Sequence, residues 1–73
     1  MIELAELKAR ISKAGPNGVK TSHIRDDYEP IGQLLINDLV ATGEYVTMRI
    51  RTGLMESAWF IFQKDQAPYH QEC

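Results

Sequence analysis

Two carboxamides and two arginines are the side chains of this 73-residue sequence whose types and spacing favour a binding surface. Gln33 and Asn37 lie four residues apart, so both project from one side of the chain if this stretch is helical. Arg49 and Arg51 lie two residues apart, which places both on one face of a strand. Two such like charges repel each other, and an anion between them offsets that cost. Alternatively, the two amides are ordinary solvated residues of a surface helix. The two arginines would equally serve to balance the charge of nearby carboxylates.

Catalytic machinery is not recognisable in the sequence. It contains no nucleophile elbow, no phosphate-binding loop and no histidine paired with cysteine or aspartate at a recognisable spacing. The single cysteine, Cys73, and the two histidines, His23 and His70, lie too far apart to indicate a zinc site. A chain of this length also leaves little room for a substrate pocket. We therefore predict that the protein is not an enzyme and has no metal or cofactor.

The charge balance weighs against a simple nucleic-acid-binding surface. The formal net charge is −2 and the pI is about 5.5, whereas phosphate contacts normally need a basic face. The distribution of charge matters more than its sum. Asp26, Asp27 and Glu29 cluster shortly before the stretch with the two amides, where carboxylates suit the dipole of a following helix. If they belong to the functional surface instead, they indicate a basic protein partner.

The sequence carries no signal for a membrane or for export. Its apolar runs are far shorter than the ~20 residues that a membrane helix needs. The N-terminal stretch has Glu3 and Glu6 and no apolar core of a signal peptide. We expect a cytoplasmic protein, and Met1 followed at once by a helix favours a stand-alone chain over a fragment of a larger regulator.

Two helices are expected in the first part of the chain. Residues 2–13 have apolar side chains at helical spacing, and residues 15–18, Gly-Pro-Asn-Gly, end that helix in a turn. Residues 19–20 are too short for an independent strand but can add a bridge to a later sheet. Thr21 or Ser22 then caps a short helix to about residue 28, its hydroxyl accepting free backbone N–H groups.

The chain is organised around a third helix, residues 31–42. Leu35, Ile36 and Leu39 form its inward stripe, opposite the two amides. Pro30 stands before it, and Gly43 after it is free to take the left-handed conformation that ends helices. Two short helices with a tight break between them form a helix-turn-helix pattern.

After Gly43 the apolar period changes from 3.6 to 2, which predicts a β-hairpin. Residues 46–51 form its first strand, residues 52–56 the loop, and residues 57–63 the returning strand. Trp59 in the returning strand is expected to fill the core under the hairpin. We predict an α+β domain over residues 1–63 and a polar, flexible tail over residues 64–73.

This order of elements resembles the winged helix-turn-helix superfamily, three helices followed by a two-stranded β-hairpin wing. The residues that carry the resemblance are those at positions 19–24, the pattern Leu35-Ile36-x-x-Leu39-x-x-x-Gly43-x-Tyr45, and Ala58-Trp59-Phe60-Ile61. The resemblance covers roughly residues 2–63. It implies that the third helix enters the major groove of DNA while the wing lies along the backbone or minor groove. Because winged helices serve several unrelated functions, it indicates fold more than function.

Carried onto this chain, the resemblance implies a set of DNA-binding residues. Gln33 and Asn37 would read bases, since their amides can pair bidentately with adenine. The phosphate contacts would come from Lys20, Ser22, His23, Arg49 and Arg51. A narrower likeness, to winged helices that bind Z-form nucleic acid, fails because Asn37 replaces their exposed tyrosine and Glu56-Ser57-Ala58 precedes Trp59 in place of two prolines.

Two functions from different classes follow. The first is a small bacterial or phage transcription regulator that occupies an operator on double-stranded DNA, as a homodimer, because dimerisation adds affinity and half-site specificity. The alternative is a protein-interaction module that binds or inhibits another protein. Its partner-binding surface would consist of Asp26, Asp27 and Glu29 together with Leu54 and Met55, which are apolar residues at the expected tip of the wing.

Overall fold

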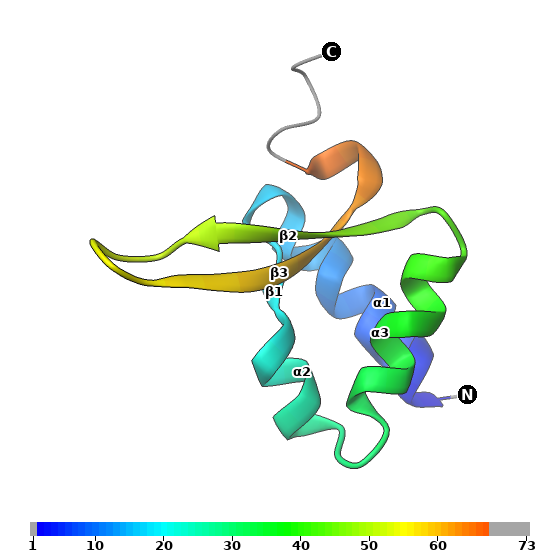
Figure 1. The fold of residues 1–73 in the computed structure, drawn as a ribbon. Helices are drawn as coiled ribbons and strands as arrows, with labels where there is room; N and C mark the ends of the chain where they lie inside the picture. The colour runs from blue at the N-terminus through cyan, green and yellow to red at the C-terminus, as the bar shows by residue number, and fades with distance from the viewer. Residues whose placement is uncertain (1, 68–73) are drawn as a thin grey trace.

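The computed structural model describes residues 2–67, which form three α-helices, three β-strands and two short 3-10 helices. In chain order the elements are α1 (Ile2–Ala14), η1 (Gly15–Asn17), β1 (Val19–Lys20), α2 (Thr21–Asp27), α3 (Gly32–Ala41), β2 (Tyr45–Arg51), β3 (Ser57–Gln63) and η2 (Lys64–Gln66). Figure 1 shows the helices gathered beneath the sheet, with the far end of the β2–β3 hairpin projecting beyond them. Among these residues, no helix has both the length and the apolar character that crossing a membrane requires.

The sheet is antiparallel and has the strand order β1–β3–β2. Tyr45 faces Gln63 at one end of the hairpin, and Arg51 faces Ser57 at the other. The short β1 adds to the opposite edge of β3, where Val19 faces Ile61. The predicted α+β class with three helices is therefore confirmed, but the sheet has three strands in place of the predicted two. The reason is that the 19–20 bridge is a full pair of residues in register with β3.

One core holds the helices to one face of the sheet. Its fully buried members come from all three helices and from β3, as the periodicity of the helices predicts. The buried residues of this cluster are Leu7, Ile11, Val19, Ile24, Leu35, Ile36, Leu39, Tyr45 and Ile61. Phe62 points to the other face of the sheet, and it is buried there because Gly18 beside η1 packs directly on its ring. The sheet is thus covered by helices on one face and partly by the α1–β1 turn on the other.

The helix α2 and the helix α3 touch through their backbones at Gly32. A Cβ atom at this position would lie 2.6 Å from the Cα of Arg25 and 2.7 Å from the carbonyl oxygen of Ile24. Both distances are well inside van der Waals contact, and backbone atoms cannot rotate away. A residue without a side chain is therefore required here, and it sets how closely α3 approaches α2.

Three local predictions differ from the structure or are refined by it. Thr21 is not a cap: it lies inside α2, is buried, and donates its hydroxyl proton to the carbonyl oxygen of Trp59 at 3.2 Å. Gly43 has φ of +82°, which confirms its left-handed role at the end of α3. The chain remains packed beyond Gln63, since η2 follows and Ala67 is only 4% exposed. The remainder of the predicted tail, including Pro68, lies outside the described residues.

Replacing Gly32 with alanine should destabilise the fold. Alanine favours helices over glycine by up to about 1 kcal/mol, so a substitution free of clashes would stabilise α3. The backbone contact with α2 reverses that sign, and we expect a net loss of about 1–3 kcal/mol, as for overpacked cores. Urea unfolding followed by circular dichroism measures the change. Leu34→Ala, at a 60% exposed position of the same helix, is the control; equal stability of the two variants would contradict the required close approach at Gly32.

Candidate functional site

A hollow of about 480 Å³ opens between α2, α3 and the sheet. Its lining mixes apolar and polar side chains, an arrangement suited to a partner that is part ring and part hydrogen-bonding group. The lining residues are Thr21, Arg25, Gln33, Ile36, Asn37, Val40, Ala41, Thr47 and Trp59. Both amides that the sequence singled out therefore lie in one concave surface, as their four-residue spacing predicts.

A chain of hydrogen bonds links the two helices along the rim of this hollow. Arg25 donates from Nη1 to Oε1 of Gln33 at 3.2 Å, and Gln33 donates from Nε2 to Oδ1 of Asn37 at 3.0 Å. All three side chains are exposed, so the chain orients them without removing them from solvent. Asn37 takes part in this chain only through its oxygen, so within residues 2–67 its amide nitrogen has no partner and remains free to donate to a ligand.

Trp59 corrects the prediction that it fills the core. Its side chain is 52% exposed, and it forms a wall of the hollow. Residues two apart on a strand share a face, so Trp59 lies on the same face of β3 as the fully buried Ile61. Ile61 lies under the helices, whereas Trp59 lies one step further out, where the helical layer ends. Phe62 and Ile61 supply the packing that the sequence interpretation assigned to the indole.

The arginines of β2 continue the surface beyond Trp59. Arg49 is directly opposite Trp59 in the hairpin and Arg51 is directly opposite Ser57, so all four side chains share one face of the wing. Both arginines are exposed, and they line a second hollow of about 560 Å³ with Met55, Glu56 and Ser57. We call the continuous surface of Arg25, Gln33, Asn37, Trp59, Arg49 and Arg51 the α3–wing face.

The other predicted phosphate contacts divide between two surfaces. Ser22 is exposed on α2, one turn before Arg25, and so lies beside the α3–wing face. Lys20 and His23 instead line a separate hollow with Arg10, Lys13 and Phe60. The structure thus does not bring all of the predicted residues together. Sequence reasoning did not assign Arg25 or Trp59 to this surface. No local signal identifies Arg25, because only the packed structure shows that Thr21, one turn before it, faces the sheet.

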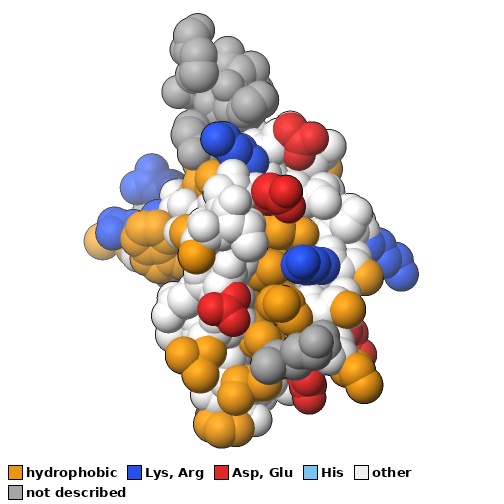
Figure 2. All heavy atoms as spheres, turned by 90° about the vertical axis from the view of Figure 1, so that its right-hand side faces the viewer, with side chains coloured by type: hydrophobic (Ala, Val, Ile, Leu, Met, Phe, Trp, Pro, Cys, Tyr) orange, Lys and Arg blue, Asp and Glu red, His pale blue; other side chains and the backbone are white. Residues whose placement is uncertain are grey.

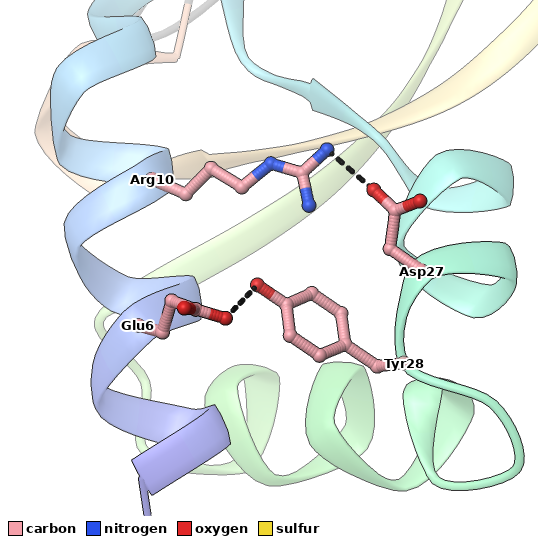
Figure 3. A network of polar contacts seen from close by, with 4 residues as sticks. All are labelled: Glu6, Arg10, Asp27 and Tyr28. Carbon is pink, nitrogen blue, oxygen red and sulfur yellow. Dashed lines mark hydrogen bonds and ion pairs between the residues drawn. The ribbon is translucent and has the colours of Figure 1, made fainter.

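The acidic residues that precede α3 do not act as one cluster. Asp27 lies toward α1 and forms an ion pair with Arg10, with 2.9 Å between the carboxylate and the guanidinium (Figure 3). Beside it, Tyr28 donates its hydroxyl proton to Glu6 at 3.0 Å. The Arg10 guanidinium also lies 5.9 Å from the centre of the Tyr28 ring. The pKa of Arg10 is raised above its ordinary value, most of all by hydrogen bonding with Tyr28 and to a smaller extent by the interaction with Asp27. All three acidic residues are exposed, but Asp27 is held toward α1 by its ion pair, whereas Asp26 and Glu29 form no ion pair with the residues from 2 to 67.

The wing tip is as apolar and as exposed as the sequence predicts. Leu54 and Met55 are 87% and 91% exposed, the highest values among the large apolar side chains described. Elsewhere charge is mixed: on the face seen in Figure 2, acidic and basic side chains are interspersed around a band of hydrophobic ones. The charged members of the α3–wing face, Arg25, Arg49 and Arg51, are cationic, and Glu56 is the acidic residue beside the two wing arginines.

Comparisons with protein-family models, with curated proteins and with solved structures find no match to this chain. Among residues 2–67 there is also no group of three or more His, Cys, Asp and Glu side chains placed to hold a metal ion. The α3–wing face is therefore interpreted from its own chemistry, which offers stacking, amide hydrogen bonds and cationic contacts.

If Trp59 is a surface residue, its removal should cost much less stability than removal of its buried neighbour. We expect Phe62→Ala to lower the free energy of unfolding by about 3–5 kcal/mol, as for buried aromatic side chains. Trp59→Ala should lose at least about 2 kcal/mol less, because half of the indole is already in water. Urea unfolding followed by circular dichroism compares the two variants. Equal losses would show that Trp59 belongs to the core.

Proposed function

We propose that this protein binds double-stranded DNA through its α3–wing face and regulates transcription by occupying an operator. The observation that carries the proposal is the joining of three chemistries on one surface. Gln33 and Asn37 offer amide groups from α3, Trp59 offers a half-exposed indole, and Arg49 and Arg51 extend cationic charge along the wing. Amides suit base edges in the major groove, and arginines suit phosphates.

Uncompensated charge supports this assignment. The one ion pair among residues 2–67 joins Arg10 to Asp27, so Arg25, Arg49 and Arg51 have no carboxylate within ion-pair distance in this part of the chain. Three unpaired cations on one surface of an acidic protein favour an anionic ligand. The net charge of −2 weakens long-range attraction to DNA but does not remove this local match.

The arrangement of elements supports a winged-helix mode of binding. The order α1, β1, α2, α3, β2, β3 and the projecting hairpin are compatible with a winged helix, in which α3 enters the major groove and the hairpin contacts the flanking backbone. In this mode α3 acts as the reading helix and Arg25 holds its first amide in place through the bond to Gln33. A single domain contacts few base pairs, and dimerisation on an operator would supply the remaining affinity.

Fluorescence anisotropy with mixed-sequence duplexes across a salt series tests the proposal. We expect binding by the wild-type protein that weakens steeply as salt rises, because phosphate contacts release counterions. The double variant Arg49→Ala/Arg51→Ala should bind more weakly to every sequence. Its slope of log affinity against log salt should be smaller by about 2, roughly 0.9 for each phosphate that the variant no longer neutralises.

A matched control is available in Lys8→Ala/Lys64→Ala, which removes the same charge from exposed positions outside the α3–wing face. This variant should keep the wild-type slope. Equal losses in the two double variants would mean that net charge, and not the wing, governs binding. No duplex binding by the wild-type protein at low salt would overturn the proposal.

That last outcome would favour the alternative function, a protein-interaction module. The specific observation behind it is the exposure of Leu54 and Met55 at the wing tip, since neighbouring apolar side chains held in water are typical of a contact with another chain. The acidic part of this alternative is weakened by Asp27, which already has Arg10 as its partner.

A further inference from the structure

A second cationic surface, separate from the α3–wing face, surrounds a hollow of about 420 Å³. Arg10 and Lys13 come from α1, Lys20 comes from β1, and His23 comes from α2. Phe60 forms part of the wall, and no acidic side chain among residues 2–67 lines this hollow. We call it the basic hollow.

The charge in the basic hollow is only partly neutralised. Asp27 pairs with Arg10, but Lys13 and Lys20 make no ion pair with any residue from 2 to 67. Three of the eight Lys and Arg side chains of the chain converge here, from α1 and from β1 on the other side of the η1 turn. Gathering like charges costs free energy unless an anion with several charged oxygens bridges them.

The basic hollow lies at the β1 edge of the sheet, and none of its lining residues belongs to the α3–wing face. Trp59 and Phe60 are consecutive residues of β3, so their side chains point to opposite faces. Trp59 belongs to the α3–wing face, whereas Phe60 lines the basic hollow and faces Lys20 across the β1–β3 pair. The two surfaces therefore use different side chains, and a duplex on the α3–wing face leaves those of the basic hollow available to a second ligand.

We infer that the basic hollow binds the phosphodiester backbone of a second nucleic-acid segment, so that one protein molecule bridges two duplexes. The inference rests on the proposed function for the identity of the ligand. Lysine ammonium groups and the imidazole of His23 are flexible donors that suit phosphate oxygens without reading sequence. The α3–wing face then supplies recognition, and the basic hollow supplies a sequence-independent attachment.

A bead assay measures bridging directly. One duplex is attached to beads, and recovery of a second, fluorescent duplex is followed as protein is added at low salt. The wild-type protein should retain the second duplex. Lys13→Ala/Lys20→Ala should recover several-fold less of it while its anisotropy-measured affinity for a single duplex stays within about threefold of wild type, because the α3–wing contacts remain.

Two controls make the result specific. Lys8→Ala/Lys64→Ala carries the same charge change outside both surfaces and should bridge like wild type. Lys13→Ala alone, at an exposed position of α1, should give an intermediate loss without any risk to β1, and circular dichroism checks the folding of each variant.

Each contrary outcome has a distinct meaning. Bridging by Lys13→Ala/Lys20→Ala at the wild-type level would overturn this inference and point to bridging through a dimer. Binding of a single duplex by the wild-type protein without any bridging would overturn this inference and leave the proposed function standing. Failure to bind any duplex would overturn both.

Discussion

At Gly32 the backbones of α2 and α3 approach so closely that a methyl group would lie 2.6 Å from the Cα of Arg25. Because Gln33 is the next residue, the same contact brings its amide within 3.2 Å of the Arg25 guanidinium, and Asn37 follows one turn later. The polar rim of the hollow is thus a direct consequence of helix packing. A larger residue at position 32 would separate the helices and the rim together.

The alternation of β3 distributes the other features of the molecule. Three consecutive side chains of this strand lie in three different environments. Trp59 lies on the α3–wing face, Phe60 lines the basic hollow, and Ile61 is fully buried beneath the helices. The cations follow the same division, with Arg25, Arg49 and Arg51 on one surface and Arg10, Lys13 and Lys20 on the other. A net charge of −2 therefore conceals two separate cationic surfaces, which supports the view that charge distribution is more informative here than its sum.

Much of the fold could be predicted from periodicity. The helical stripe of residues 31–42 identified Leu35, Ile36 and Leu39 as buried, and the change to a period of 2 placed the hairpin, because both patterns are local consequences of burying one face. The positions of Thr21 and Trp59 could not be predicted in this way. Whether Trp59 is buried depends on where the helical layer ends above β3, and whether Thr21 caps α2 or packs inside it depends on its tertiary partner, the Trp59 carbonyl group. For the same reason, the sequence did not show that Lys20 and His23 lie on a different surface from Ser22. Only the packed structure defines which side of α2 faces the sheet.

We propose that duplex DNA contacts the α3–wing face, and NMR shifts of the backbone amides and the indole during titration with a mixed-sequence duplex test this contact residue by residue. We expect saturable shifts for the backbone amides of Arg25, Gln33, Asn37 and Arg49 and for the indole N–H of Trp59. Shifts confined to the wing tip at Leu54 and Met55, or no shifts at all, would show that the α3–wing face does not contact duplex DNA.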